Sequence, residues 1–492
     1  MEETNLPREY ATGKKELFFG LGILLSAMAL CNFIVFGGFN LGFAIAGCLC
    51  ILCCAGYLLG KGCKPGLYPC AILSLCLVIT AAFARSDDGF VKFVMFCFLT
   101  AGTCLGLCLL AGKQRRNPGS PASLWDIFFA AFRLGFGELS PAFRGLRTAL
   151  RRSGPAGQKS TAILVGLAIA LPLLCIMVPL LMFADAAFEG LMDLLPEFSV
   201  AELFVTVLFG GMLACILYTM GVALVQYEAT EPQEKKSGRG LASLTVNTVL
   251  IAVCVVYVAY LLSQLAYFAG GFSGILPQGY TLAQYARRGF FEIAWLCAIN
   301  LGIIALSLVL NRQKDPAPRS TRLLCLFIAL VTLFLVATAS AKMFLYIESY
   351  GLTRLRVLTQ VVLLFLGLIT GLVAVRLFVP KLPYMKTVVL AGLLLGALVI
   401  WVDVDSFVAK YNVDAYLSGE LETVDVSHLS VLGDGAIPHI YRLAQEAPDK
   451  EIAHQADATL ARHWTQDPGD FRGWNYANQV ATEYLVALEQ DS

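Results

Sequence analysis

The chain has 492 residues, of which 58% are hydrophobic and 14% charged, and a mean hydropathy of +0.72. Soluble domains average about 25% charged residues, so this composition excludes an ordinary soluble protein and indicates an integral membrane protein. The net charge of +1 is unevenly spread, because residues 403–492 hold sixteen acidic and five basic side chains. A basic membrane body with an acidic tail argues against a nucleic-acid partner.

Apolar runs long enough to cross a bilayer follow a polar start. A signal peptide would have a shorter core and a cleavage site of small residues, so we interpret the first run, Leu17–Phe36, as an uncleaved span. Further runs cover 40–60, 67–84, 89–111, 161–183, 200–227, 243–268, 289–310, 321–347, 354–379 and 385–402. Each has about the ~17–20 residues that a crossing requires. We therefore predict an all-α integral membrane protein, a polytopic helical bundle of about eleven spans with a small, mainly helical soluble C-terminal domain.

Basic residues in the loops predict the orientation, because cytoplasmic loops are enriched in Lys and Arg. With the N-terminus inside, the inner loops contain Lys61, Lys64, Lys113, Arg115, Arg116, Lys235, Lys236, Arg239, Arg312, Lys314, Arg319, Arg322, Lys381 and Lys386. The outer loops include residues 85–88 and the acidic stretch 185–197. An odd number of spans then places the C-terminal domain outside.

The runs divide the chain into four predicted segments. Residues 1–112 form a four-span bundle rich in Cys and Gly, 113–160 a basic cytoplasmic loop, 161–402 a seven-span core bundle and 403–492 an exported acidic domain. In the loop, the aromatic run 124–136 is too short to cross and predicts an amphipathic helix in the headgroup layer. A surface helix that only connects two bundles is the alternative. We expect anionic lipid headgroups to bind the basic side chains that follow, Arg144, Arg147, Arg151 and Arg152.

Sequence motifs predict no catalytic residue, no metal site and no cofactor. All four His lie in the tail without a close metal-binding pair. Cys50 and Cys53 have CxxC spacing, but they lie within a span and have no second pair at zinc spacing, so packing is the simpler interpretation. Residues 56–61 are one residue short of a phosphate-binding loop and lack its Ser or Thr, and no GxSxG nucleophile motif occurs.

Charged residues gather at the predicted outer face of the membrane. The outer span ends bring together the candidate vestibule residues Asp185, Arg287, Arg288, Glu292, Lys342, Glu348, Arg354 and Arg356, with Asn300 two helical turns deeper than Glu292. Lys92, Glu189, Asp403 and Asp405 lie at the same predicted face. Charge beside hydrocarbon is costly and usually has a partner or a task. One interpretation is an outward-facing polar vestibule that binds an ion, a lipid headgroup or a small solute. The other is a ring of paired charges that fixes helix register and docks the acidic tail.

Three classes of function fit these features. The first is a non-enzymatic protein for transport or envelope sensing, with the vestibule as its site. The second is a membrane-embedded enzyme for a lipid-linked or phosphate-bearing substrate, with Glu292 or Asp185 as base and Arg288 or Arg354 holding a phosphate. The third is a structural or regulatory protein whose tail recruits another envelope protein. The lack of a catalytic motif favours a protein that is not an enzyme.

Several short motifs resemble those of a bacterial membrane family known as domain of unknown function 4173, which is related to number 4153. They are 184–188 (ADAAF), 287–292 (RRGFFE) with Asn300, 350–356 (YGLTRLR), 412–416 (NVDAY), 436–438 (AIP) and 474–476 (WNY). The resemblance covers roughly residues 160–480. It implies a multi-pass protein of the bacterial cytoplasmic membrane, and it implies no activity or catalytic residue.

Overall fold

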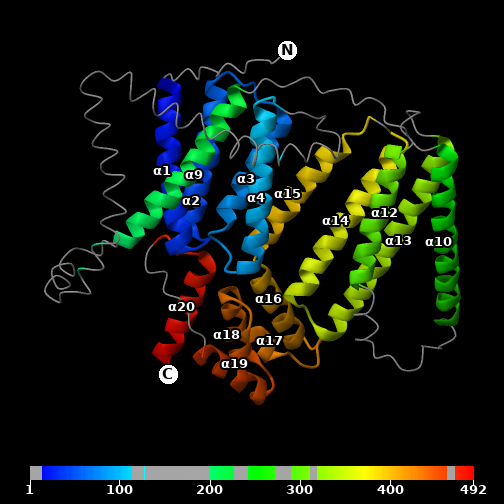
Figure 1. Cartoon of the computed structure of the whole chain (residues 1–492). Coiled ribbons are helices and arrows are strands. Elements are labelled where there is room, and N and C mark those ends of the chain that lie inside the picture. Colours follow the sequence, from blue (N-terminus) through cyan, green and yellow to red (C-terminus); the bar gives the residue numbers. More distant parts are fainter. Residues whose placement is uncertain are drawn as a thin grey trace, which may run out of the picture. The chain divides into compact units, whose positions relative to one another are not determined.

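The structure, a computed structural model, describes residues 14–113, 127, 177, 181, 200–226, 242–271, 290–310, 318–379, 381–462 and 471–491. Across this part of the chain every regular element is a helix (Figure 1). The described residues fall into two compact units. Unit 1 holds those numbered up to 226 and those from 471 to 479, and unit 2 holds the others. The predicted all-α class is confirmed for the described residues.

Eight described helices are long and apolar enough to cross a membrane: Lys15–Gly37, Leu41–Gly60, Gly89–Leu110, Val205–Gln226, Ser243–Ser263, Arg319–Tyr350, Arg354–Arg376 and Tyr384–Val402. Two shorter apolar helices, Leu67–Ala82 and Glu292–Leu308, coincide with two further predicted spans. A membrane protein is therefore supported. The number of eleven spans stays a prediction, because the run 161–183 lies outside the described residues, as do Arg144, Arg147, Arg151 and Arg152.

In unit 1, α1 (Lys14–Gly37) packs along α9 (Val200–Gln226) and α2 (Leu41–Gly60) (Figure 1). The approach of α1 to α9 depends on Gly210, because a Cβ atom there would lie 2.7 Å from the Cα atom of Met28. Small residues at such crossings let membrane helices pack closely. Next to α2 lies α3 (Leu67–Ala82), which also packs on α4 (Gly89–Leu110).

Residues 471–479 lie against helix ends of unit 1, although they follow those helices by hundreds of positions. The backbone N–H groups of Leu41 and Gly42 donate to the carbonyl oxygens of Trp474 and Arg472, at 3.0 and 3.2 Å. The backbone N–H of Tyr476 donates to the carbonyl oxygen of Ala84 at 2.8 Å.

The side chain of Arg472 extends this contact to α1 and α9. Its guanidinium forms an ion pair with Glu202 and donates to Oδ1 of Asn32 at 2.9 Å. The amide of Asn32 in turn donates to the same Glu202 carboxylate at 2.8 Å. The segment therefore joins the end of α1, the start of α2, the residues after α3 and the start of α9 on one face of unit 1.

Unit 2 contains five longer helices: α10 (Ser243–Gly271), α12 (Phe290–Leu310), α13 (Arg319–Tyr350), α14 (Arg354–Arg376) and α15 (Tyr384–Val402). The first four run beside one another (Figure 1). Leu250, Ile304 and Ile328 lie fully buried where α10, α12 and α13 meet. Their apolar side chains fill the interior of this bundle.

One polar triad interrupts that apolar interior. The hydroxyl of Tyr257 on α10 donates to Oδ1 of Asn300 on α12 at 2.6 Å, and the Asn300 amide donates to Oγ1 of Thr332 on α13 at 2.9 Å. The Thr332 hydroxyl donates a hydrogen bond to the carbonyl oxygen of Ile328 at 2.7 Å. Hydrogen bonds between polar side chains stabilise the packing of membrane helices, and these bonds link α10, α12 and α13.

Short helices follow the bundle in unit 2 and gather at one end of it (Figure 1). They are α16 (Val404–Leu417), α17 (Val426–Ser430), the 3₁₀ turn η3 (Asp434–Ala436), α18 (Ile437–Glu446), α19 (Lys450–Arg462) and the later part of α20 (Tyr476–Asp491). Ile437, Ile440 and Leu443 recur at helical spacing on α18 and are all buried. This pattern shows that α18 packs into a small helical core against α16 and α19.

Candidate functional site

The turn between α13 and α14 is enclosed by α16. The amide of Asn412 brackets the backbone of Leu352, because its Oδ1 accepts from the Leu352 N–H at 2.6 Å and its Nδ2 donates to the Leu352 carbonyl at 2.8 Å. Gly351 makes this approach feasible. Its φ is +72°, and a Cβ atom there would lie 2.6 Å from the Asn412 Oδ1 atom. Glycine is thus required both by the backbone conformation and by the space available.

Arg354, at the start of α14, forms a two-pronged ion pair with Asp405 of α16. Nε donates to Oδ1 at 2.7 Å and Nη2 donates to Oδ2 at 2.5 Å. The backbone N–H of Gly433 donates to the same Oδ2 atom at 2.9 Å. The Asp405 side chain is 1% exposed and that of Arg354 is 33% exposed. A carboxylate so deeply buried depends on its cationic partner, because a lone buried charge is strongly destabilising.

Arg356, in the first turn of α14, caps the C-terminal end of α13. Its Nη1 donates to the carbonyl oxygens of Tyr350, at 3.0 Å, and of Gly351. Its guanidinium also lies 4.0 Å from the centroid of the Tyr346 ring. Cations favour a helix C-terminus, where carbonyl groups are left without helical partners. We name the assembly of Gly351, Leu352, Arg354, Arg356, Asp405 and Asn412 the clasp.

His428 on α17 adjoins the clasp. Its Nε2 atom is buried and has no hydrogen-bond partner among the described residues. Burial lowers the pKa of His428, and although the Asp425 carboxylate opposes that change, the cations Arg356 and Arg354 lower the pKa further. The Asp405 carboxylate gives a smaller opposing effect. The imidazole is therefore held neutral at pH 7 beside two arginines.

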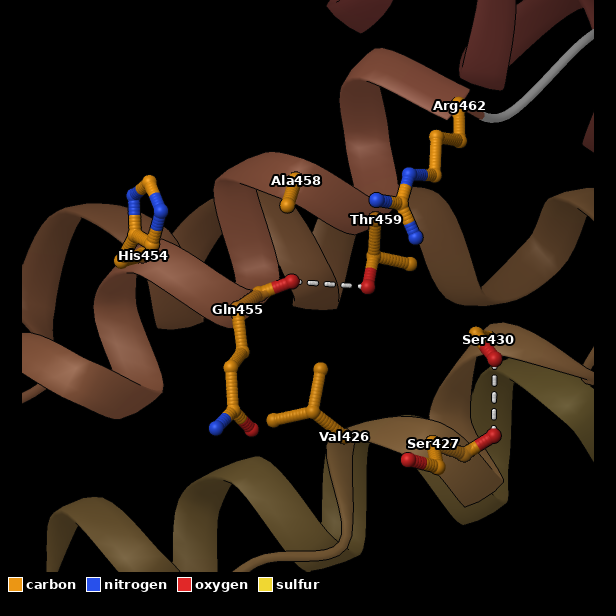
Figure 2. Close-up of a pocket in the computed structure, with 8 residues that line it drawn as sticks. All are labelled: Val426, Ser427, Ser430, His454, Gln455, Ala458, Thr459 and Arg462. Carbon is orange, nitrogen blue, oxygen red and sulfur yellow. Dashed lines mark hydrogen bonds between the residues drawn. The ribbon is translucent and has the colours of Figure 1, made fainter.

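A polar cleft of about 610 Å³ lies on α17 and α19 (Figure 2). Its lining residues are Val426, Ser427, Ser430, His454, Gln455, Ala458, Thr459 and Arg462. The short helix α17 thus contributes His428 beside the clasp and two serines to the cleft. A movement of α17 would therefore change both the surroundings of the clasp and the shape of the cleft.

The structure unites only part of the predicted vestibule. Arg354 and Arg356 lie together in the clasp, whereas Asn300 belongs to the buried triad. Lys342 is half-buried on α13, and Glu348 and Glu292 are exposed on α13 and α12. Asp185, Arg287 and Arg288 lie outside the described residues. The vestibule as a whole therefore stays a prediction.

Asp405 was predicted among the outer-face charges but not as the partner of Arg354, and Asn412 and Gly433, which also hold the clasp, were not predicted. Asp405 follows directly after the last predicted span, and a buried acidic partner for Arg354 could have been sought there. Asn412 belongs to the NVDAY motif of the family resemblance. For Gly433, which contributes only its backbone N–H, no sequence signal exists.

The clasp is suited to holding two elements together. Arg354 is engaged by a carboxylate, and Arg356 by two carbonyl groups and a ring. Among the described residues no cluster of three His, Cys, Asp or Glu side chains is arranged to bind a metal ion. The clasp thus joins α14 and α16 through an ion pair, with a neutral histidine nearby.

Comparison with known proteins gives one match. Residues 70–443 match the family model described as "Domain of unknown function (DUF4153)". No curated protein and no solved structure matches the chain. The family found is the relative of the one that the motifs resembled, number 4173, and membership of the latter stays a prediction.

Proposed function

The chain belongs to the DUF4153 family, whose description gives no activity, and from that premise we propose that it is an envelope sensor in the bacterial cytoplasmic membrane. In this proposal eleven spans carry the N-terminus inside and the helices α16–α19 outside. The predicted vestibule opens at the outer face, with Arg354 and Arg356 at its edge. At the inner face, Arg144, Arg147, Arg151 and Arg152 bind anionic headgroups.

The observation that carries this proposal is the buried Arg354–Asp405 pair. It ties α14, a helix long and apolar enough to span the membrane, to α16, the first of the short helices. A transported solute needs a pathway, whereas a sensor needs a firm connection between the part that binds and the part that responds. The clasp supplies such a connection, and its paired arginines are poorly placed to hold a substrate phosphate.

Contacts within each unit support the proposed sidedness. In unit 1, residues 471–479 meet the end of α1, the start of α2 and the start of α9. In unit 2, α16 meets the turn between α13 and α14. All these helix ends belong to the face that the distribution of Lys and Arg predicts to be outside.

Amide hydrogen exchange of the whole protein in lipid nanodiscs tests the connection. We expect Arg354→Ala to accelerate exchange in α16 and also in the last turn of α13 and the following turn, because the clasp holds both sides. Lys410→Ala, which removes a cation from α16 without touching the clasp, should leave exchange in α13 unchanged. Acceleration confined to α16 would contradict a role in transmission.

A second variant tests the vestibule. Glu292→Ala removes an exposed charge at the start of α12, and in this proposal the variant inserts and folds normally. If both Arg354→Ala and Glu292→Ala instead fail to insert, the charges serve assembly alone and the vestibule is refuted.

A further inference from the structure

The cleft on α17 and α19 is built from one face of each helix. Gln455, Ala458, Thr459 and Arg462 stand at spacings of three, four and seven residues, which places them on the same side of α19. Across from them, α17 contributes Ser427 and Ser430 (Figure 2). The small side chain of Ala458, midway along the α19 face, leaves room between the polar groups on either side.

Arg462 is the cation of this cleft. Four other basic residues occur from residue 403 onward, and two of them, Arg442 and Arg472, are taken up by ion pairs. Arg462 has no hydrogen bond or ion pair within the described residues, and its guanidinium points along the face that carries Thr459 (Figure 2). A guanidinium directed into a cleft can hold a carboxylate or phosphate through charge-assisted hydrogen bonds, and here it does so against the eleven excess negative charges of residues 403–492.

The neutral polar groups that line the cleft indicate which class of small molecule it can bind. The hydroxyls of Ser430 and Thr459 donate to the backbone carbonyls of Ser427 and Gln455, at 2.7 and 2.8 Å, which leaves their oxygen atoms able to accept hydrogen bonds. The Gln455 Nε2 donates to the Glu451 carboxylate at 3.0 Å, which leaves its second N–H and its amide oxygen available to a guest. Such neutral groups match the hydroxyls of a sugar, and the volume of about 610 Å³ lies within the range usual for small-molecule sites.

We propose that this cleft binds a small sugar that carries one carboxylate or phosphate group, with Arg462 holding the anionic group and the hydroxyl and amide groups holding the ring. The site deepens the proposed sensing function and rests on it. Binding draws α17 and α19 together, and three residues after α17 the backbone N–H of Gly433 donates to Asp405 of the clasp at 2.9 Å. The occupied cleft thereby acts on the clasp.

Binding is tested by calorimetry on the whole protein in nanodiscs, with glucuronate, glucose 6-phosphate, glucose and inorganic phosphate as probes. We expect at least one of the two anionic sugars to bind more tightly than glucose and than phosphate alone. Arg462→Gln should weaken that binding about tenfold or more, since a charge-assisted pair is lost. Ala458→Phe should abolish it by filling the cleft.

Lys450→Gln serves as the matched control, because it removes one positive charge from the same helix away from the cleft, and it should bind as the unaltered protein does. If neither anionic sugar binds, or if Arg462→Gln and Ala458→Phe bind unchanged, the cleft assignment is overturned. If phosphate alone binds as tightly as the sugars, the sugar part of the assignment is overturned.

Hydrogen exchange at the α13–α14 turn, measured with and without the bound sugar, separates this inference from the function on which it rests. Binding that also slows exchange at the turn supports both. Binding without any change at the turn supports the cleft and refutes sensing through the clasp. Absence of binding, together with the coupled exchange expected for Arg354→Ala, refutes the cleft alone.

Discussion

At the scale of single residues, Asp405 has the largest expected effect on stability. Arg354→Ala leaves the buried Asp405 carboxylate with only the Gly433 N–H as a described partner. Breaking a buried pair costs about 3–5 kcal/mol, and we expect the lower end because Arg354 is one-third exposed. A thermal-unfolding scan in detergent should show a lowered Tm. Arg442→Ala, which breaks pairs with exposed partners, should lower Tm much less. Equal losses of Tm for both variants would contradict the clasp.

His428 gives the clasp a dependence on pH. Its pKa is lowered in the folded protein by burial, with Arg356 and Arg354 adding to that effect and Asp425 and Asp405 opposing it. The unfolded chain therefore takes up a proton first, at about pH 6.5. The stability that the neutral imidazole provides is complete above that pH and is lost as the pH falls through the lower folded value.

We expect Tm to fall less between pH 7.5 and pH 5.5 in His428→Gln than in the unaltered protein. His439, whose pKa is also lowered by burial, retains its own contribution in that variant. An identical fall of Tm in both proteins would show that His428 does not titrate against the clasp.

At the scale of elements, the polar triad fixes how α10, α12 and α13 meet. Asn300→Leu keeps the branched shape of the side chain but removes both hydrogen bonds, from Tyr257 and to Thr332. Hydrogen bonds between membrane helices contribute about 0.6–2 kcal/mol each, so a loss of roughly 1–4 kcal/mol is expected, measured as the decrease in Tm. Thr248→Ala, which removes an exposed hydroxyl bonded within α10, is the control. A neutral Asn300→Leu would show that packing alone holds these helices.

Helices were predictable here and their partners were not. A run such as 354–379 is apolar over more than the thickness of a bilayer, so its length and composition determine a helix at α14. The cost of charge next to that run also predicted a task or partner for Arg354. Sixteen acidic residues of the tail were candidates, however, and only tertiary structure selects Asp405. The cleft escaped prediction for a similar reason, since Ser427, Thr459 and Arg462 are ordinary surface residues until α17 and α19 meet.

At the scale of the whole molecule, the proposed orientation is open to a direct test. The sixteen Cys all precede Lys342, so the tail contains no native thiol. Once those sixteen are replaced, a single Cys introduced into the tail is the one thiol that a maleimide can label. We expect Lys450→Cys, exposed on α19, to react in intact cells with a membrane-impermeant maleimide. Lys381→Cys, exposed in the predicted inner loop before α15, should react only after the cells are opened. The reverse pattern would invert the topology and place the cleft in the cytoplasm.

The contact between Arg472 and the start of unit 1 has a consequence for biogenesis. Asn32 and Arg472 are 440 positions apart, and Glu202 precedes Arg472 by 270. At about 5–20 residues per second, translation takes roughly 20–90 s to travel from the first of these residues to the last. During the last 270 residues of that interval, the Asn32 amide on α1 and the Glu202 carboxylate on α9 have both been synthesised while Arg472 has not. In nascent chains stalled before Arg472, the Asn32 amide and the Glu202 carboxylate would lack this partner and be accessible to the proteases and chaperones that act during membrane insertion.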